Sequence, residues 1–324
     1  MPKRALITGV TGQDGAYLAQ LLLGEGYEVV GLAGPSSQER LADERLAWLG
    51  IADQVRIVAG DLMDAPALGR LIEALAPDEV YNLAAQSSVA ASWRQPRASS
   101  QVTSVGAANL LEAVKLAAPA ARFYQASSSE IFGRSDVDAQ DETAPVRPRS
   151  PYAAAKLFSH WMTVAYREGF GLHASAGILF NHESPLRAPH FVTRKVTDGA
   201  ARIKLGLAGE LRLGNVDARR DWGHARDYVR AMWLMTQQDA PDDYVIATGR
   251  TTTVRAMCEI AFGYLGLKLE DWLVIDPALW RPVEIEVLRG DPAKAARQLG
   301  WSATVTLEQM IREMVDADMA RLAA

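Results

Sequence analysis

The feature that most constrains the fold is a glycine-rich turn near the start of the chain. Gly9-Val10-Thr11-Gly12-Gln13-Asp14-Gly15 follows a short β-rich run, Arg4–Thr8, and leads into an apolar helical pattern, Gln13–Glu25. Glycines in such a turn let backbone N–H groups approach a pyrophosphate at the N-terminus of the helix. The plainer alternative is a tight turn that binds nothing. Because strand, glycines and helix come in the order that a dinucleotide site needs, we expect cofactor contacts from Gly9, Thr11, Gly12, Gln13, Asp14 and Gly15.

Short β-rich runs and helical patterns alternate through the N-terminal half. The predicted strands are Arg4–Thr8, Tyr27–Leu32, Val55–Ala59, Glu79–Leu83, Arg122–Ala126 and Leu172–Phe180. The predicted helices between them are Gln13–Glu25, Glu39–Leu49, Ala65–Leu75 and Ala98–Ala117. This alternation is typical of βαβ units. We therefore expect an α/β fold with a doubly wound, Rossmann-type parallel sheet.

In the second half, the sequence predicts two loops, Asn181–His190 and Gly214–His224, followed by further helices. The predicted helices are Ala225–Gln238, Thr253–Gly266, Pro292–Leu299 and Leu307–Leu322. Asp291-Pro292 is typical of an N-cap followed by proline at the first helical position. We expect residues 1–180 to form the cofactor-binding domain. Residues 181–324 are expected to form mainly a smaller substrate-binding domain, with some segments returning to the first.

Composition excludes several classes of function. The chain has 34 Lys and Arg against 39 Asp and Glu, a net charge of −5, so no global positive field attracts nucleic acid or an anionic membrane. The single cysteine, Cys258, predicts a reducing, cytoplasmic location without disulfides or thiolate zinc sites. The five histidines show no ligand spacing, so no metal is expected. Nor does the sequence predict a signal peptide or a membrane span.

Two further segments follow predicted strands, at the edge where open α/β sheets bind ligands. Gly60-Asp61-Leu62 follows the third strand, and Leu83-Ala84-Ala85-Gln86-Ser87 follows the fourth. From these segments we expect cofactor contacts by Asp61, Leu62, Leu83, Ala84, Ala85 and Ser87. Ser88 is expected on the substrate side.

Tyr152 and Lys156 stand four residues apart, which places a phenol and an ammonium group on one face of a helix. An exposed pair of this kind is common and has no function. A phenol has a pKa of about 10 in water, so it acts as a base near neutrality only beside positive charge. Together with the glycine turn, the pair favours catalysis.

This combination resembles the extended short-chain dehydrogenase/reductase family, and Ala126-Ser127-Ser128-Ser129-Glu130-Ile131-Phe132-Gly133 narrows the resemblance. The family implies that Ser128 binds the reacting oxygen and that Tyr152 and Lys156 contact both reaction and cofactor. An acid two residues after Ser128 is typical of dehydratases within the family. Glu130 is thus expected to act as acid and base, the alternative being a solvated loop carboxylate.

Four later segments resemble the GDP-mannose 4,6-dehydratases, so that the resemblance covers nearly the whole chain. They are Ile178–Pro185, Phe191–Lys195, Arg219–His224 and Trp280–Glu284. The resemblance implies cofactor contacts by His182 and Arg187, although a histidine there is often only structural. It implies substrate contacts by Ser88, Ser128, Glu130, Asn181, Val192, Lys195, Arg220, Arg281 and Glu284. Arginine suits a diphosphate because it binds oxygens in a two-pronged fashion.

The sequence departs from this family after the second strand. Relatives carry paired arginines there that suit the 2′-phosphate of NADP, whereas this chain has Ala33-Gly34-Pro35-Ser36-Ser37-Gln38-Glu39-Arg40. We expect NADP, contacted by Ser36 and Arg40, with NAD as a possible cofactor. Ala98 also replaces a tyrosine that contacts the cofactor in some relatives. Because the same loop helps relatives assemble, both a homodimer and a homotetramer remain open.

The sequence therefore predicts a dehydratase that converts GDP-mannose to GDP-4-dehydro-6-deoxy-mannose, a hydro-lyase reaction with internal hydride transfer. One alternative is another nucleotide-sugar enzyme of the same fold, a 4-epimerase or a 4-keto-6-deoxy-sugar reductase. A second is a non-catalytic NADP-binding sensor. Glu130 argues against the first alternative, and the combination of Ser128, Glu130, Tyr152 and Lys156 argues against the second.

Overall fold

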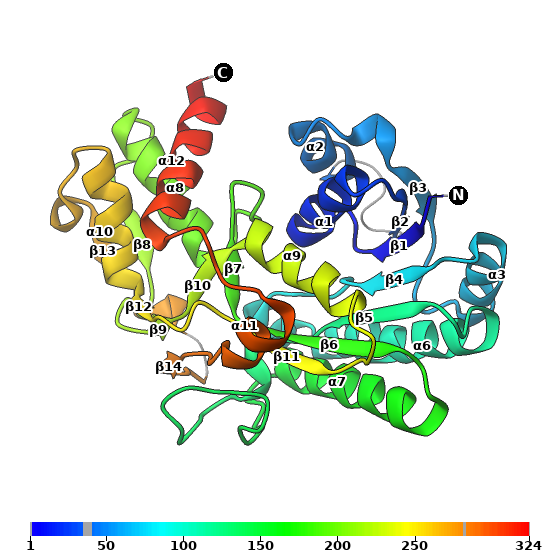
Figure 1. Cartoon of the computed structure of the whole chain (residues 1–324). Coiled ribbons are helices and arrows are strands. Elements are labelled where there is room, and N and C mark those ends of the chain that lie inside the picture. Colours follow the sequence, from blue (N-terminus) through cyan, green and yellow to red (C-terminus); the bar gives the residue numbers. More distant parts are fainter. Residues whose placement is uncertain (1, 35–40, 281–282, 324) are drawn as a thin grey trace.

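A seven-stranded parallel sheet forms the centre of the larger lobe in the computed structural model, which describes residues 2–34, 41–280 and 283–323 (Figure 1). The strand order is β11-β6-β5-β4-β1-β2-β3. The bounds are β1 Arg4–Thr8, β2 Glu28–Ala33, β3 Arg56–Ala59, β4 Glu79–Asn82, β5 Arg122–Ala126, β6 Ala174–Leu179 and β11 Asp243–Ile246. Because the chain winds outward from β1 in both directions, the predicted doubly wound sheet is confirmed.

The ends of the six predicted strands lie within two residues of their predicted positions, whereas the seventh strand, β11, was not predicted. The largest difference is at β6, which begins at Ala174 rather than Leu172. Gly171 adopts a left-handed conformation at the end of the preceding helix, and the Leu172 N–H donates back to Tyr166 O. Leu172 therefore closes the helix instead of joining the sheet.

Helices cover both faces of the sheet (Figure 1). On one face lie α1 (Gln13–Gly24) and α9 (Ala225–Thr236), with α2 (Leu41–Trp48) beside α1. On the other lie α3 (Ala65–Leu75), α6 (Gly106–Ala117) and α7 (Pro151–Phe170). Since α9 and β11 follow residue 180, part of the C-terminal half belongs to this lobe.

The predicted helix Ala98–Ala117 is present, but it is not α-helical throughout. The structure has α4 (Val89–Arg94), α5 (Pro96–Ser100), a π-helical turn (Gln101–Val105) and then α6. Within the π turn, the Thr103 carbonyl accepts a hydrogen bond from Ser159 Oγ of α7 at 2.7 Å. A side chain of a neighbouring helix thus donates a hydrogen bond to a backbone carbonyl of the π turn. Helical periodicity in the sequence gives no sign of this tertiary contact.

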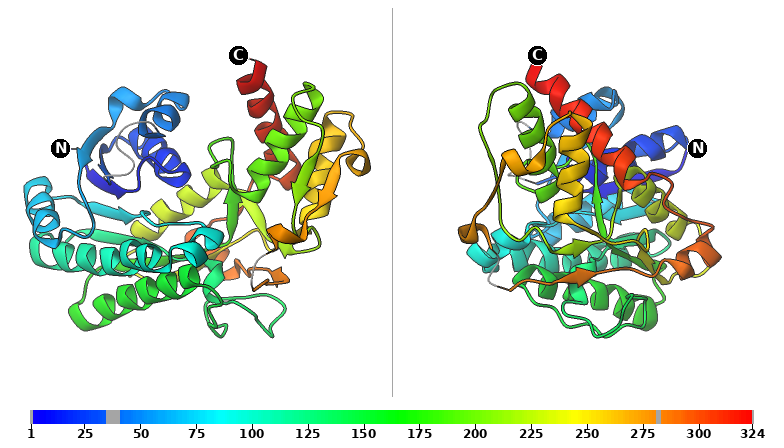
Figure 2. Two further views of the ribbon diagram at one scale, coloured as in Figure 1. Left: turned by 180° about the vertical axis from the view of Figure 1, so that it is seen from behind. Right: turned by 90° about the vertical axis from the view of Figure 1, so that its left-hand side faces the viewer.

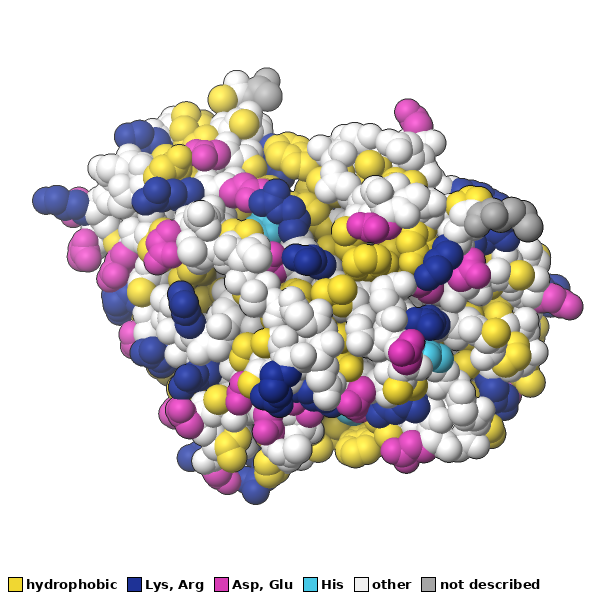
Figure 3. Space-filling model, in the orientation of Figure 1, with side chains coloured by type: hydrophobic (Ala, Val, Ile, Leu, Met, Phe, Trp, Pro, Cys, Tyr) yellow, Lys and Arg dark blue, Asp and Glu magenta, His cyan; other side chains and the backbone are white. Residues whose placement is uncertain are grey.

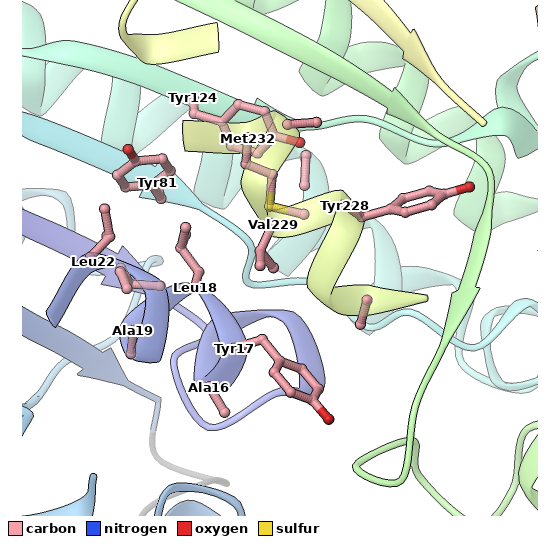
Figure 4. Close-up of a cluster of buried hydrophobic side chains, with 14 of the residues drawn as sticks. Ala16, Tyr17, Leu18, Ala19, Leu22, Tyr81, Tyr124, Tyr228, Val229 and Met232 are labelled. Carbon is pink, nitrogen blue, oxygen red and sulfur yellow. The ribbon is translucent and has the colours of Figure 1, made fainter. Parts of the chain in front are cut away.

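The interface between α1 and α9 contains much of the core of the larger lobe (Figure 4). Leu18 and Leu22 of α1 lie opposite Val229 and Met232 of α9, and all four are buried. Tyr81, from the sheet beneath, is also buried and donates its hydroxyl proton to Glu79 Oε2 at 2.6 Å. Burying an aliphatic side chain contributes about 1.5–3 kcal/mol. The two halves of the chain therefore share one core.

The smaller lobe, seen from two sides in Figure 2, has a hydrophobic core of its own. Three helices enclose it with a two-stranded sheet: α8 (Val192–Lys204), α10 (Val254–Tyr264) and α12 (Leu307–Ala323), with β8 (Leu211–Leu213) and β13 (Leu273–Ile275). Helix α8 was not predicted. Helix α11 (Ala293–Leu299) begins one residue after the predicted Pro292, because Pro292 is its N-cap and Asp291 Oδ1 accepts from Ala293 N at 2.9 Å.

The two predicted loops of the second half contain short strands. Strand β7 (Asn181–Glu183) pairs in parallel with β10 (Trp222–His224). Three more strands form a small sheet: β9 (Arg219–Arg220), β12 (Thr252–Thr253) and β14 (Val287–Leu288). Two- and three-residue strands are too short to give a sequence pattern. These short strands include Asn181 and Arg220, two of the residues expected to bind substrate.

Among the described residues, the helices are all too short or too polar to cross a membrane. The same residues contain no cluster of three or more His, Cys, Asp or Glu side chains suited to a metal ion.

Candidate active site

A cleft of about 570 Å³ lies between the carboxyl edge of the sheet and the smaller lobe. The predicted site residues that line it are Asp14, Leu83, Ala85, Ser87, Ser88, Ser128, Glu130, Tyr152, Lys156, Asn181, His182, Arg187, Val192, Lys195, Arg220 and Glu284. Acidic and basic side chains are interspersed over the face seen in Figure 3. Residues from both halves of the chain thus meet in one cleft.

The remaining predicted site residues fall into two groups. Ser36, Arg40 and Arg281 lie outside the described residues. Described but outside the cleft lining are Gly9, Thr11, Gly12, Gln13, Gly15, Asp61, Leu62 and Ala84. Most of these belong to the turn beneath the cleft, whereas Leu62 is buried in the core cluster on the α3 and α6 face.

The glycine turn requires glycine for steric reasons. Gly9 has φ +71°, and a Cβ there would lie 2.9 Å from Ala84 N. A Cβ on Gly15 would lie 2.3 Å from Gly9 O, because α1 starts directly against the turn. The backbone at Gly9 therefore packs against the segment after β4 too closely to leave room for a side chain. This close approach at a helix N-terminus fits a dinucleotide diphosphate.

A buried hydrogen-bonded chain links the sheet edge below the cleft to Lys156. Thr8 Oγ1 donates to Asn82 Oδ1 at 2.7 Å, and Asn82 Nδ2 donates to Gln125 Oε1 at 2.8 Å. Gln125 Nε2 then donates to Ala126 O at 3.0 Å. The same carbonyl accepts from Lys156 Nζ at 2.8 Å. The lysine is thus positioned by β1, β4 and β5 together.

Helix α7 supplies both Tyr152 and Lys156. Ser150 caps it, with Ser150 Oγ accepting from Ala153 N at 3.1 Å, and proline occupies the first helical position. The two functional side chains are buried, and Lys156 Nζ lies 5.9 Å from the centre of the Tyr152 ring. The four-residue spacing places both groups in the cleft.

Burial shifts both pKa values away from the ordinary range. Burial lowers the pKa of Lys156 to about 8. It raises the pKa of Tyr152 to about 12, against the effect of a hydrogen bond from Ser128 and with a further rise from the negative charge of Glu130. Removal of the phenol proton near neutrality therefore needs additional positive charge in the cleft.

Ser128 and Glu130 lie directly after β5. Ser128 Oγ accepts a hydrogen bond from Glu130 N at 3.3 Å and begins a 3₁₀ turn, Ser129–Ile131. Both residues line the cleft, and both influence the pKa of Tyr152. A hydroxyl, a carboxylate and a phenol therefore converge on one region of the cleft.

The opposite wall combines charged and aromatic side chains. Arg220 Nη2 lies 3.2 Å from Glu284 Oε1, so two predicted substrate ligands form an ion pair. Sequence reasoning missed several wall residues, namely Trp93, Arg94, His190 and Arg212. Ser88, which caps α4, is the only signal that a helix carrying Trp93 and Arg94 follows the fourth strand.

The cleft also fits a nicotinamide dinucleotide. Ser127 Oγ lies in the cleft lining next to Ser128, is buried, and has no protein hydrogen-bond partner. A buried hydroxyl without a partner is rare and suits a ligand polar group. It stands at the same sheet edge as the glycine turn, so a ligand extended along that edge reaches both.

The doubly wound sheet, the glycine turn and the Ser128, Tyr152 and Lys156 set define an extended short-chain dehydrogenase/reductase. Comparison with known proteins narrows this class. The model of the family described as GDP-mannose 4,6 dehydratase matches residues 6–314. The chain belongs to this family.

Two relatives and one solved structure illustrate the similarity. GDP-mannose 4,6 dehydratase 1 of Arabidopsis thaliana is 49% identical, over 98% of this chain and 90% of its own length. GDP-mannose 4,6-dehydratase of Sinorhizobium fredii is 46% identical, over 99% and 97%. The dTDP-glucose 4,6-dehydratase DesIV of Streptomyces venezuelae, solved with NAD, is 26% identical and superposes with a TM-score of 0.84 over 97% of each chain. The family expected from sequence is therefore confirmed.

Proposed function

We propose that this protein is a GDP-mannose 4,6-dehydratase, a hydro-lyase that forms GDP-4-dehydro-6-deoxy-mannose. Family membership supports the reaction, and one structural observation carries it. Glu130 shares the cleft with Ser128, Tyr152 and Lys156, and it is close enough to Tyr152 to raise the phenol pKa. An oxidation alone requires no second acid or base, whereas loss of water does.

Each proposed catalytic residue has a separate task. Tyr152, as phenolate, takes the proton of the sugar C4 hydroxyl, and Ser128 donates a hydrogen bond to the C4 oxygen. The ketone formed at C4 acidifies the C5 hydrogen, which Glu130 removes as a proton. Glu130 then protonates the C6 hydroxyl, which leaves as water, so one carboxylate serves as base and then acid.

When bound, a nicotinamide cofactor would supply the chemistry of hydride transfer, from C4 at the start and to C6 after water has left. C5 then takes up one proton, which balances the proton that Tyr152 removed from the C4 hydroxyl and gives up at the end of the cycle. Lys156 contributes positive charge beside Tyr152 and a donor for the nicotinamide ribose. Ser87, Leu83 and Ala85 would form the cofactor side of the cleft, where they lie in its lining. Residues 1–180, with α9 and β11, are proposed as the cofactor-binding domain.

For the cofactor we propose NADP, with weaker discrimination against NAD than in relatives that carry the arginine pair. The support is the family resemblance together with the absence of paired arginines from Ala33–Arg40. Losing a charged hydrogen-bond partner costs about 1.5–3 kcal/mol, or ten- to a hundredfold in affinity. Titrating both nucleotides into the stripped protein tests this. A tenfold preference for NAD, or a preference for NADP above about a thousandfold, would contradict it.

For the substrate we propose that Asn181, Val192, Lys195, Arg220 and Glu284 bind the GDP part. Their placement in the cleft wall supports this, and Arg281 belongs to the same proposal from sequence. Calorimetric titrations of GDP-mannose and a UDP-sugar into the protein should show clearly tighter binding of the guanine nucleotide. Equal affinities would remove guanine recognition from the proposal.

We propose a homodimer or homotetramer formed through the outer face of α7. Phe158 and Trp161 of this helix are 45% and 55% exposed, beside an apolar depression that both side chains line. Large exposed aromatic side chains in one patch are typical of protein interfaces. Sedimentation equilibrium should give a dimer or larger, and Trp161→Glu should reduce it to a monomer. A wild-type protein that sediments as a monomer at micromolar concentration would refute the assembly.

One experiment separates the candidate activities. The purified protein is incubated with GDP-mannose and no added nucleotide, and the product is examined for a 4-keto sugar with C6 as a methyl group. A 4-epimerase leaves no ketone, a reductase consumes one, and a non-catalytic sensor changes nothing. The proposed dehydratase alone accumulates the 4-keto-6-deoxy product.

A further inference from the structure

His182, on β7, has a hydrogen-bond acceptor at each ring nitrogen. His182 Nδ1 lies 2.7 Å from Phe180 O, and Nε2 lies 2.9 Å from Asp14 Oδ2. A carbonyl and a carboxylate oxygen only accept, so both nitrogens must carry a proton. A neutral imidazole has one N–H, and therefore this arrangement requires the imidazolium ion.

The groups around the ring agree with a buried cation. Tyr228 of α9 stacks on the ring at 4.5 Å with an interplanar angle of 23°, and the ring quadrupole favours a cation. Arg187 is directed to Glu183, with its Nε 2.9 Å from Glu183 Oε2. On the paired strand β10, His224 faces Glu313 instead, at 3.4 Å.

The pKa directions support the same charge state. Burial alone lowers the pKa of His182, but the charge and hydrogen bond of Asp14 outweigh it and the pKa is raised. Burial alone raises the pKa of Asp14, but the charge and hydrogen bond of His182 outweigh it and hold the pKa at about 2. A proton shared the other way, with neutral His182 and protonated Asp14, is therefore disfavoured.

Asp14 creates an electrostatic problem for the proposed cofactor site. It belongs to the part of the glycine turn that forms the first turn of α1, and it lines the cleft. A carboxylate at this position interacts favourably with the positive N-terminal end of the helix dipole, and its negative charge repels a bound diphosphate. An anion-binding helix start therefore needs a compensating positive charge.

Asp14 also has a structural task that explains its presence. Gln13 Nε2 donates to Asp14 Oδ1 at 3.0 Å and to His182 O at 3.1 Å. Ser184 Oγ donates to Gln13 Oε1 at 2.8 Å. Gln13 and Asp14 together fasten the start of α1 to β7 across 168 residues of sequence.

We propose that His182 is a fixed cation that neutralises Asp14, so that the start of α1 can accept the cofactor diphosphate. His182 acts through its charge, since both of its N–H groups are already used within the protein. The residue is a positioning residue in this role. Two further cations lie near this turn: Arg45, whose Nη1 donates to Thr11 O at 2.8 Å, and Arg187, which is paired with Glu183. The inference rests on the proposed cofactor site.

The test compares cofactor affinity in a charge series. NADP is titrated into stripped wild-type protein and into His182→Gln, Asp14→Asn and the double variant. His182→Gln leaves Asp14 uncompensated and should weaken NADP binding at least tenfold. The double variant lacks both charges and should recover to within about threefold of Asp14→Asn. His160→Gln, a buried histidine outside the cleft lining, is the matched control and should bind like wild type.

Two outcomes would overturn the inference: a double variant that binds NADP as weakly as His182→Gln, or resonances showing that no histidine holds both ring protons to a higher pH than an ordinary imidazole. If the double variant binds as weakly as His182→Gln, His182 contacts the nucleotide or supports the fold instead. Nuclear magnetic resonance of the wild-type protein with labelled histidines tests the charge even where His182→Gln does not fold. One of the five histidines should keep both ring protons to a higher pH than an ordinary imidazole, and Asp14→Asn should lower its pKa. Failure of wild-type protein to bind either nicotinamide nucleotide would contradict the proposed cofactor instead, leaving the resonance result independent.

Discussion

Replacing Lys156 by methionine should abolish one contribution to the stability of the cofactor-free protein, a rise in the free energy of unfolding between pH 8 and pH 10. Lys156 has a pKa of about 8 in the folded protein, against 10.5 when exposed. Between these values the unfolded chain binds more protons than the folded one, so the free energy of unfolding rises with pH. A shift of this size corresponds to about 3 kcal/mol in total, of which about 2 kcal/mol returns between pH 8 and pH 10.

At pH 7 the folded protein thus carries the full cost of a buried ammonium group. Methionine removes that cost and also removes the hydrogen bond from Nζ to Ala126 O, which is worth about 1.5–3 kcal/mol. The two effects nearly cancel, so Lys156→Met should be close to wild type in stability at pH 7 and inactive. As the pH rises, the free energy of unfolding of the wild type should increase relative to that of the variant.

The assay is urea unfolding of both stripped proteins at half-unit steps from pH 7 to pH 10. Taking the difference between the two proteins cancels the titration of all other groups. The wild type should gain about 2 kcal/mol relative to the variant across the upper two pH units. A constant difference, or a relative loss by the wild type, would refute the assignment of a depressed lysine pKa to this site.

Three further substitutions test the site and its turn. Glu130→Gln should bind GDP-mannose within a few-fold of wild type while product formation falls about 10²–10⁴-fold; turnover within a few-fold of wild type would remove it from the mechanism. Tyr152→Phe should show no reduced-nicotinamide absorbance in a single turnover with GDP-mannose, and a wild-type rate would mean that another residue is the base. Gly15→Ala should abolish cofactor binding, because its Cβ would lie 2.3 Å from Gly9 O, whereas Gly24→Ala on the same helix meets no atom within 4 Å and should bind normally.

Six of the seven strands of the main sheet were predictable because their signals are local, whereas β11, which follows the loops of the second half, was missed. Each parallel strand is a short apolar run with a turn at its end, and β1 and β5 were predicted to the residue. The proximity of Tyr152 and Lys156 likewise follows from a four-residue spacing within one helix. Structural features that depend on only a few consecutive residues can thus be predicted from the sequence.

Features that depend on distant partners were not predictable. Helix α8 was missed because its sequence is rich in charged and hydroxyl residues at buried positions. Arg194 is buried against Asp318 of α12, with Nη2 2.6 Å from Oδ1, and Thr197 Oγ1 lies 2.7 Å from Oδ2 of the same carboxylate. A buried ion pair has the sequence pattern of a solvent-exposed face. The pairing of Asp14 with His182 is hidden in the same way.

The π turn at Gln101–Val105 has a consequence for how this cleft can change in evolution. A π turn holds one residue more than the α-helical turn that it replaces. Deleting one residue there would restore a regular α-helical turn and leave the segments on either side close to their present orientation, because a π turn and an α turn each complete one rotation. Helix α4, which carries Trp93 and Arg94 in the cleft wall, precedes the turn, whereas α6 is anchored against the sheet. The π turn is therefore a position where the chain can lose a single residue while the cleft wall, the sheet, the glycine turn and α7 keep their places.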